Sequence, residues 1–367
     1  MRTPPWFEAG GDRGLRRLGL LPLSVLSWGY GGATRLHRWW WSRGPGERVR
    51  LPCKVVSVGS LVVGGAGKTP TAAWIASGLR RRGHRVALAS RGYGRSRGDR
   101  IEIASDGRRV HGSVERVGDE ALLLAALAPG APVLVGPRRD AVGQRAIAAF
   151  GAQVLVLDDG FQHHRLQRDL DLVVLPGAGG LGSARVLPRG PLREPLTGLS
   201  RADAVGVVDG PLSPEDERRV EGVAPGALRF RIERRASFLR SLQGDQRRPS
   251  SRLAGTRVGL LCGLGRPAAF RATLRELKVQ VVAERIFPDH HRYRARDLVG
   301  LSEQASLWLT TEKDALKLLP SWARGAEVWV VELETRVIEG EALLDWIEER
   351  LRARPGGRPL ALPSLAV

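Results

Sequence analysis

The chain has few cysteines, few lysines and few acidic residues. Its two cysteines, Cys53 and Cys262, are far apart and form no Cys-x-x-Cys motif. This argues against a disulfide framework or structural zinc and fits a reducing compartment. Only 38 residues are acidic against 58 basic ones, of which five are lysine, and the net charge is +20. No nucleic-acid-binding motif accompanies this charge. The excess therefore suits an anionic membrane surface or a phosphorylated substrate, or reflects compositional bias.

The N-terminal region has an uncharged stretch flanked by arginines. Residues 18–33, LGLLPLSVLSWGYGGA, are fewer than the roughly 20 apolar residues of a spanning helix. Three tryptophans, 39–41, follow beside arginines and resemble an interfacial anchor. A signal peptide and an ordinary buried helix are the alternatives. We expect a membrane-anchoring helix here.

The segment 54–71, KVVSVGSLVVGGAGKTPT, joins an apolar strand to a glycine-rich turn and a helical pattern. In such a loop, backbone N–H groups and the helix dipole bind phosphate. Lys68 would reach the β- and γ-phosphates, and Thr69 can bind Mg²⁺. A chance glycine-rich turn is the alternative. The rest of the predicted cradle is Gly64, Gly65, Ala66 and Gly67.

Short apolar runs alternate with helical patterns through the first half of the chain. Continuous runs of this kind are typical of parallel strands covered on both faces, so the predicted class is α/β, a parallel-sheet domain with a P-loop. The predicted strands are 55–58, 86–89, 133–135, 154–157, 170–175 and 204–208.

A second strand-helix series follows a polar, arginine-rich stretch. Its predicted strands are 258–261, 279–282, 307–309 and 328–331, with helices at 268–277 and 342–353. The predicted organisation is a membrane-associated segment (1–45), a P-loop nucleotide-binding domain (46–233), a linker (234–254), a second, smaller α/β domain (255–353) and a poorly ordered tail (354–367).

Several polar groups follow predicted strands or begin helices. Asp158 and Asp159 end the strand 154–157, so they should share a crevice with the phosphate loop, where one would hold Mg²⁺. Asp119 and Glu120 begin a helix, where capping is the alternative role. His290 could work with a carboxylate in proton transfer, or the His-His pair could be purely structural. The proline-rich loop 187–195 carries arginines suited to phosphate, or is simply solvated.

Taken together, these segments resemble the tetraacyldisaccharide 4′-kinase family of lipid A synthesis. The similarity extends from the N-terminal apolar segment to about residue 350. The matching pieces are VGSLVVGGAGKTP (58–70), SRGYGR (90–95), VGDEALLLA (117–125), VGPRRDA (135–141), LDDGFQHHRLQRDLDLVV (157–174), LPRGPLREPL (187–196), FPDHHRY (287–293) and TTEKDALKL (310–318).

The resemblance implies transfer of the γ-phosphate of ATP to the 4′-hydroxyl of tetraacyl-disaccharide 1-phosphate, with Mg²⁺. It makes Asp119 the base and His290 the group that orients it, and domain closure would assemble this dyad. It assigns the other roles as follows: Gln162 and His163 to the nucleotide; Thr69, Asp158, Asp159 and Glu194 to the metal; Arg193 to the substrate.

The implied partners are the lipid substrate and an anionic membrane surface, without nucleic acid, and we expect a monomer. An acyl-chain substrate leaves a bilayer at a cost of roughly 0.8 kcal/mol per methylene, so the enzyme must dock at the surface. ATP and reduced cysteines place the catalytic domains on the cytoplasmic face of the inner membrane.

The chain departs from the family pattern at three positions. Ser60 replaces an asparagine, Val62 a small hydroxyl residue and Phe161 a leucine. Val62 also stands where the strict P-loop pattern has its first glycine, for which Gly59 and its neighbours partly compensate. Two other functions stay open: a P-loop NTPase acting as a molecular switch, and a membrane-surface scaffold without nucleotide affinity.

Overall fold

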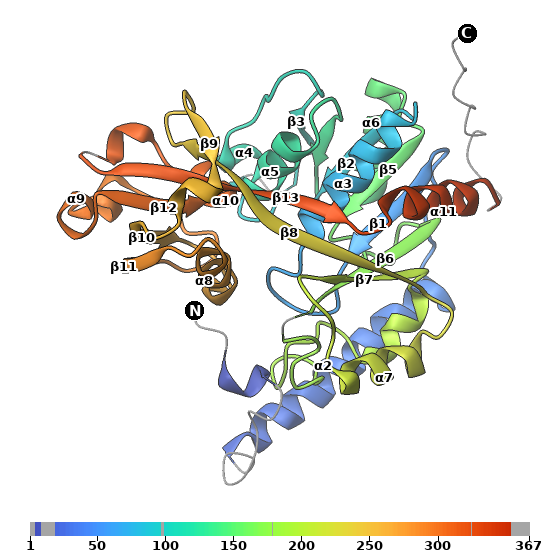
Figure 1. Ribbon diagram of the computed structural model, residues 1–367. Coiled ribbons are helices and arrows are strands. Elements are labelled where there is room, and N and C mark those ends of the chain that lie inside the picture. Colours follow the sequence, from blue (N-terminus) through green and yellow to red (C-terminus); the bar gives the residue numbers. More distant parts are fainter. Residues whose placement is uncertain (1–3, 9–18, 97–98, 178, 324, 354–367) are drawn as a thin grey trace. The chain divides into compact units, whose positions relative to one another are not determined.

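The computed structural model describes residues 4–8, 19–96, 99–177, 179–323 and 325–353. These residues form two compact units (Figure 1). The larger unit contains residues 4–233 and 336–353, and the smaller unit contains 234–335. The smaller unit is therefore an insertion in the sequence of the larger one. The predicted tail, 354–367, lies outside the described residues.

The larger unit is built on a mostly parallel sheet with the strand order β8-β7-β6-β1-β5-β2-β4-β3. Only β3 runs antiparallel, along β4. The strands are β1 (Lys54–Gly59), β2 (Val86–Ser90), β3 (Glu102–Ser105), β4 (Val133–Val135), β5 (Val154–Asp158), β6 (Leu170–Pro176), β7 (Ala204–Val208) and the start of β8 (Leu228–Ser241). All six strands predicted for this region are confirmed.

Helices cover both faces of this sheet, which is why its strands read as continuous apolar runs. Helix α6 packs against Val55, Ala87 and Leu155 on one face. Side chains alternate along a strand, so Val56 and Leu88 face the other side, where α3 contacts β1, β2 and β5. The helices of this unit are α2 (Leu21–Ser42), α3 (Lys68–Arg81), α4 (Val114–Val117), α5 (Asp119–Leu127), α6 (Arg139–Phe150), α7 (Pro214–Val223), α11 (Gly340–Ala353) and the 3-10 helices η1 (Pro5–Phe7) and η2 (Leu196–Arg201).

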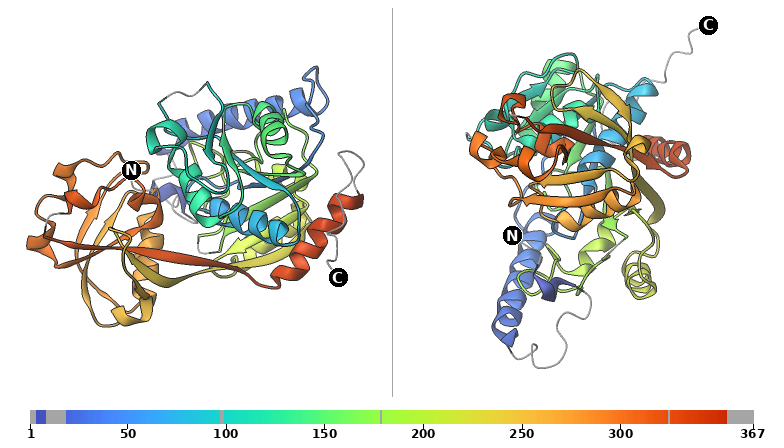
Figure 2. Two further views of the ribbon diagram at one scale, coloured as in Figure 1. Left: turned by 90° about the horizontal axis from the view of Figure 1, so that it is seen from above. Right: turned by 60° about the vertical axis from the view of Figure 1, so that its left-hand side comes forward.

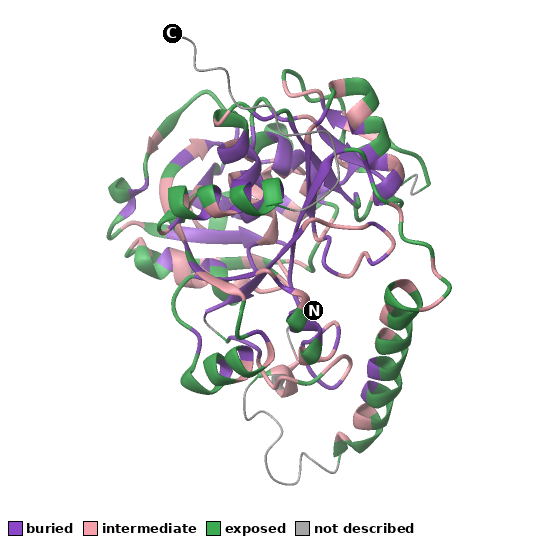
Figure 3. Ribbon diagram, turned by 90° about the vertical axis from the view of Figure 1, so that its right-hand side faces the viewer, coloured by how far each residue is buried: buried purple, intermediate pink, exposed green. Residues whose placement is uncertain are grey.

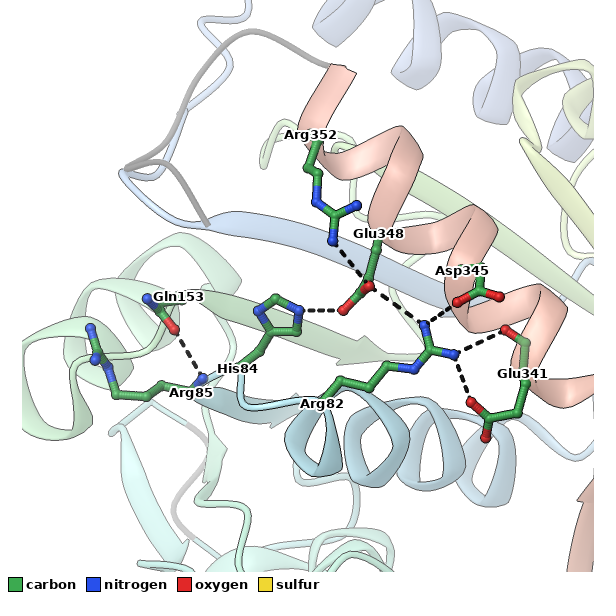
Figure 4. Close-up of polar contacts among 8 residues, drawn as sticks. All are labelled: Arg82, His84, Arg85, Gln153, Glu341, Asp345, Glu348 and Arg352. Atoms are coloured by element: carbon green, nitrogen blue, oxygen red, sulfur yellow. Dashed lines mark hydrogen bonds and ion pairs between the residues drawn. The ribbon is translucent and has the colours of Figure 1, made fainter. Parts of the chain in front are cut away.

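Helix α11 packs against α3 within the larger unit. A Cβ atom added at Gly78 of α3 would lie 2.7 Å from Leu344 Cδ1, so glycine is what permits this close approach. Arg82, at the end of α3, donates to Glu341 Oε2 at 2.6 Å and to Asp345 Oδ1 at 2.7 Å (Figure 4). Both acids are largely exposed, so these ion pairs orient α11 more than they stabilise it.

A buried pair completes this contact. His84, which is 3% exposed, has its Nε2 atom 2.5 Å from Glu348 Oε1 (Figure 4). Buried polar groups need partners because an unpaired one costs the full desolvation penalty. The helix predicted at 342–353 therefore belongs to the larger unit, and its predicted place in the second domain is wrong.

The strands of the smaller unit have the order β11-β10-β12-β13-β8, with β9 beside β8, and β8 also pairs with β7 of the larger unit, so the strands belong to one continuous sheet. The four strands β10 to β13 are parallel, as the second strand-helix series predicts. Its elements are β9 (Arg247–Pro249), β10 (Arg257–Cys262), β11 (Gln280–Ile286), β12 (Leu307–Thr311), β13 (Glu327–Val337), α8 (Pro267–Glu276), α9 (Leu301–Gln304), α10 (Glu312–Ala315), η3 (Ser250–Leu253), η4 (Ala295–Leu298) and η5 (Pro320–Trp322).

The linker predicted at 234–254 is instead part of the folded smaller unit. Its residues form the second half of β8, β9 and η3. Leu239 is fully buried in the core of this unit, and the Arg248 guanidinium lies 3.8 Å from the centroid of the Trp329 ring. Two arginines of the stretch that suggested a solvated linker, Arg247 and Arg248, therefore lie over aromatic rings of the folded unit.

Helix α2 contacts the rest of the larger unit through a narrow seam of small residues. The Ser27 hydroxyl donates to the Val186 carbonyl oxygen at 2.7 Å. Gly31 faces the same valine, since an added Cβ would lie 3.5 Å from its side chain. The Ser24 hydroxyl accepts from Arg189 Nε at 3.0 Å. Hydrogen bonds rather than apolar burial thus define this part of the contact, and nearer the end of α2 the rings of His37 and Trp41 lie against His164 and Arg165.

Most of the rest of α2 is exposed, apart from a few half-buried residues, and Figures 2 and 3 show the helix as a rod at the periphery of its unit. An outward stripe at helical spacing consists of Val25, Trp28, Leu36 and Trp39, which are 64%, 77%, 63% and 50% exposed. Among the described residues, no helix is both long and apolar enough to cross a bilayer. An exposed aromatic stripe of this size marks an interaction surface.

Candidate functional site

The glycine-rich turn lies between β1 and α3, at the carboxyl edge of the larger sheet. Gly64 and Gly67 have φ values of 96° and 81°, which side-chain-bearing residues rarely adopt. Gly67 is the N-cap of α3, and Lys68 and Thr69 are its first residues. The free backbone N–H groups of this helix start therefore point toward the loop, as a phosphate cradle requires.

The structure explains the two unusual residues of this segment. Val62 is fully buried in the core and forms an antiparallel bridge with Leu192, so it packs inward. Gly59 is required because a Cβ there would lie 2.4 Å from the Cβ of Phe161. The Ser60 hydroxyl accepts from the Val62 N–H at 3.1 Å and so shapes the turn itself. The P-loop pattern thus lacks its first glycine because Val62, at that position, packs into the core.

Asp158 and Asp159, at the end of β5, have opposite electrostatics. Burial, then Glu120, then Asp159 raise the pKa of Asp158 to about 7, although Lys68 opposes the shift. Burial would also raise the pKa of Asp159, but Lys68 and Arg193 outweigh it and hold that pKa below its usual value. The Lys68 Nζ atom lies 3.7 Å from Asp159 Oδ1, and Arg193 Nη1 lies 2.7 Å from Asp159 Oδ2.

Glu194, predicted as a metal ligand, has both carboxylate oxygens engaged. Arg201 donates to Oε2 at 3.0 Å and to Oε1 at 2.9 Å, and Gln162 Nε2 donates to Oε1 at 3.0 Å. The same amide also donates to the Ser60 carbonyl oxygen at 3.2 Å. Glu194 therefore connects the proline-rich loop to the P-loop through Gln162, which is a positioning arrangement.

The buried polar atoms that have no partner among the described residues include three that lie around Asp158, next to the P-loop. These three are Asp158 Oδ1, His163 Nε2 and Arg139 Nε. Burial, followed by repulsion from Arg139, lowers the pKa of His163 to about 4, so this imidazole is neutral. Burial lowers the pKa of Arg139 to about 10, with Asp158 opposing. Buried polar groups are nearly always satisfied, so this set indicates the place of a polar ligand.

Asp119 is the first residue of α5 and is 2% exposed. Its N-cap is Gly118, with φ 87°, where a Cβ would lie 2.8 Å from the Tyr93 carbonyl oxygen. The neighbouring Glu120 acts electrostatically on Asp158, so the start of α5 lies close to the carboxyl end of β5. The structure thus brings together the residues predicted for nucleotide and metal, together with the start of α5.

His290 belongs to the smaller unit, in the loop after β11. It has a φ of 58°, a conformation that costs a non-glycine residue roughly 1–2 kcal/mol. The Asp289 Oδ1 atom accepts from Lys313 Nζ and from the His290 N–H, each at 3.0 Å, and Lys313 Nζ lies 3.4 Å from His290 Nε2. Lys313, from the TTEKDALKL segment, therefore fixes this loop. The pairing of His290 with Asp119 stays a prediction.

Among the described residues, no three His, Cys, Asp or Glu side chains form a ready-made metal cluster. A P-loop site needs fewer protein ligands, because the phosphates and water supply the rest. The Thr69 hydroxyl donates to Asp158 Oδ2 at 2.9 Å, which leaves the partnerless Oδ1 atom beside it. This pair of oxygen donors fits Mg²⁺.

Comparison with known proteins identifies the family. Residues 20–352 match the family described as tetraacyldisaccharide-1-P 4′-kinase. The chain belongs to this kinase family. The tetraacyldisaccharide 4′-kinase of Anaeromyxobacter dehalogenans is 41% identical over 93% of this chain and 92% of its own. That of Alkalilimnicola ehrlichii is 41% identical over 92% of this chain and 91% of its own.

A solved structure supports the same kinase family and fold. LpxK from Aquifex aeolicus in complex with ATP has 30% sequence identity, covers 91% of this chain and 99% of its own, and gives a TM-score of 0.71. The α/β class with a mostly parallel sheet is therefore confirmed for this member of the kinase family.

Sequence reasoning gave no role to two arginines of the site. Arg139 lies in the VGPRRDA segment and is only 3% exposed. Its position after the carboxyl end of β4 was the available signal. Arg201 lies outside every segment that resembles the kinase family, yet it donates to Glu194, and its guanidinium lies 4.2 Å from the centroid of the Phe161 ring. Only the folded arrangement identifies it.

Proposed function

We propose that this chain is an ATP-dependent lipid kinase that transfers the γ-phosphate to the 4′-hydroxyl of tetraacyl-disaccharide 1-phosphate in lipid A biosynthesis. Family membership supports the reaction. The observation that assigns this reaction to specific residues is a set of buried polar atoms beside the P-loop. These atoms belong to Asp158, His163 and Arg139, and they have no partner among the described residues. A bound, highly charged ligand would satisfy these atoms, and a nucleotide triphosphate is such a ligand.

In this proposal, the loop residues 64–67 and the start of α3 hold the phosphates. Lys68 moves its ammonium from Asp159 to the β- and γ-phosphates, since the 3.7 Å ion pair is weak and partly exposed. Arg193 then remains the main counter-charge of Asp159 and lies at the edge where the acceptor would arrive. Gln162 and His163 border the nucleotide from the β5 side.

Thr69 and Asp158 would hold Mg²⁺, with Asp159 close enough to bind it through water. When bound, the ion neutralises charge that develops on the phosphates. Glu194 supports Gln162 and Arg201. This differs from the metal role that the resemblance implies for it.

Asp119 is proposed as the base. Its carboxylate would accept the proton of the 4′-hydroxyl while the hydroxyl oxygen forms a bond to the γ-phosphorus. The bond between the γ-phosphorus and the β,γ-bridging oxygen breaks at the same time, and ADP leaves. Burial at a helix start fixes the rotamer of Asp119, so the carboxylate is already oriented when the acceptor binds. His290 would orient Asp119, as the resemblance implies.

Helix α2 is proposed to lie in the membrane interface, on the cytoplasmic face of the inner membrane. Its exposed stripe would enter the headgroup region while Ser24, Ser27 and Gly31 keep it attached to the larger unit. Both cysteines are free and buried, in keeping with a reducing compartment. An enzyme docked in this way can take an acyl-chain substrate without extracting it into water.

The test is transfer of labelled γ-phosphate from ATP-Mg²⁺ to tetraacyl-disaccharide 1-phosphate in mixed micelles. Asp119→Asn should lower kcat by about 10²–10⁴-fold, the usual contribution of a general base, while the Kd for ATP changes little. Glu120→Gln, the adjacent acid, is the matched control and should retain most of the turnover.

Other outcomes would change the assignment. Labelled inorganic phosphate without labelled lipid would favour the NTPase switch, and absence of ATP binding would favour the scaffold. Equal turnover of Asp119→Asn and wild type would refute the base. A double-mutant cycle of Asp119→Asn with His290→Ala tests the dyad, because additive effects on log kcat would show that the two residues act separately.

A further inference from the structure

A cleft on the larger unit lies where α2 ends and the chain turns toward β1. Its volume is about 480 Å³, which is within the range of ligand sites. Three arginines and one glutamate give it a net positive charge. The lining residues are Trp41, Glu47, Arg48, Val49, Arg50 and Arg165.

The positive charge of this cleft is only partly compensated within the described part of the chain. The side chains of Arg48 and Arg50 form no hydrogen bond or ion pair there. Arg165 Nε lies 3.4 Å from Asp140 Oδ2, but Arg138 already binds that oxygen at 2.7 Å. Many other surface arginines do have a carboxylate, as Arg219 has Glu215 at 2.6 Å.

The surroundings of Arg48 add to this charge. Arg48 is exposed at the surface, but partial desolvation and then repulsion from Arg168 lower the pKa of its guanidinium, and Asp171 opposes these effects only in part. Asp171 is itself engaged by Arg168 at 2.8 Å. An anion bound beside Arg48 would relieve this repulsion, so the cleft is electrostatically suited to a phosphate group.

Trp41 lines the cleft from α2, two residues after Trp39 and therefore on a different face of the helix from the outward stripe. It stands in the last turn of the helix, and the Arg165 guanidinium lies 5.7 Å from its ring centroid. Its Nε1 atom donates to His37 Nε2 at 3.1 Å. Tryptophan beside arginine is typical of the headgroup level of a bilayer, where Trp39 on the same helix is also exposed.

We propose that this cleft binds the phosphate of an anionic phospholipid headgroup, taken from the bilayer on which α2 lies. The planar guanidinium groups of Arg48 and Arg50 would each donate two N–H groups to phosphate oxygens. This proposal deepens the membrane docking given under Proposed function. The outward stripe supplies apolar insertion, and the cleft supplies preference for anionic lipid.

Co-sedimentation with two kinds of vesicle separates these contributions. The affinity for neutral phosphatidylcholine vesicles measures the contribution of the outward stripe. The increase in affinity when phosphatidylglycerol is added measures the contribution of the cleft. The variant is Arg48→Gln/Arg50→Gln. The control is Arg257→Gln/Arg275→Gln, which removes the same charge from two exposed arginines of the smaller unit that have no side-chain partner among the described residues.

The cleft variant should lose roughly 25-fold of the phosphatidylglycerol-dependent affinity, since each arginine near an anionic surface contributes about fivefold. The control should stay near wild type, and binding to neutral vesicles should be the same for all three proteins. Equal losses of affinity in the cleft variant and the control would show diffuse electrostatic attraction and overturn the proposal. The proposal would also be wrong if phosphatidylglycerol increased the affinity of the cleft variant as much as that of wild type.

Two further measurements identify the source of the phosphate. In calorimetry, soluble glycerol 1-phosphate should bind the wild-type protein only weakly. If it bound as tightly as the mixed vesicles do, the cleft would be a site for a free phosphate ester, and the assignment to a lipid headgroup would be wrong. Turnover in neutral detergent micelles should be unchanged in the cleft variant. A loss of turnover in these micelles would mean that the cleft binds the substrate, which would contradict this proposal. Failure of the wild-type protein to bind neutral vesicles would contradict only the membrane role of the outward stripe.

Discussion

Replacing Arg201 by Gln should destabilise the larger unit more than replacing its partner Glu194. The Glu194 side chain is only 5% exposed, so loss of Arg201 leaves a buried carboxylate without its cation, at a cost of about 3–5 kcal/mol. The Arg201 side chain is 20% exposed and can reach water, so Glu194→Gln should cost only about 1–2 kcal/mol. The double variant, with a neutral pair, should be close to Glu194→Gln.

Thermal unfolding followed by circular dichroism measures this difference. At roughly 2–4 °C per kcal/mol for a unit of this size, Arg201→Gln should lower Tm by about 10 °C. The double variant should recover most of the loss. If the two single losses were equal and additive, the pair would not be coupled and the reasoning from burial would be refuted.

The same variants test whether Glu194 binds metal. As a positioning residue, Glu194→Gln should leave the Mg²⁺ dependence of turnover near wild type. A steep rise in the Mg²⁺ concentration needed for turnover, without a change in Tm, would restore the metal role that the family resemblance implies.

Three further predictions concern other parts of the chain. Val62→Gly restores the strict P-loop glycine but should destabilise the fold by about 2–4 kcal/mol with no gain in ATP affinity, because Val62 is fully buried; tighter ATP binding in calorimetry would contradict this. Burial raises the pKa of Glu312 from 4.5 to about 7, so the folded carboxyl keeps a proton that the unfolded one loses, and wild-type stability falls as pH rises through this window. Glu312→Gln removes that titration, so its free energy of unfolding in urea, relative to that of wild type, should rise by about 3 kcal/mol between pH 4 and pH 8. A difference that does not change with pH would show that Glu312 does not titrate in this window. Trp28→Glu should weaken binding to neutral vesicles by roughly 100-fold, since a tryptophan buries about 150–250 Å² of surface, and unchanged co-sedimentation would refute insertion of this face.

The sequence was sufficient to predict the strands and the site edge. Parallel strands buried on both faces need continuous apolar runs, and ligand-binding residues gather after their carboxyl ends, so residues 154–159 could be recognised as both strand and site. Val62 could not be interpreted from the sequence, because whether a residue faces phosphate or core depends on its bridge to Leu192, far along the chain.

Domain limits and Arg201 required the fold for a similar reason. An arginine such as Arg248 in β9 reads as solvated from the sequence, because the aromatic ring over which it lies, that of Trp329, is distant along the chain. Helix α11 follows strands of the smaller unit, and nothing local shows that its partner is α3. Long-range pairing decides these features, and composition does not report it.

The insertion of residues 234–335 into the larger unit has a consequence for biosynthesis. A ribosome completes α3 early, but the helix that covers its Gly78 face, α11, is made only after the whole smaller unit. Until then, the nascent larger unit exposes an apolar face and an unmatched His84, and it is a natural client for chaperones. Nucleotide-binding competence should therefore arise late in synthesis, when α11 closes over α3, the first helix formed after the P-loop.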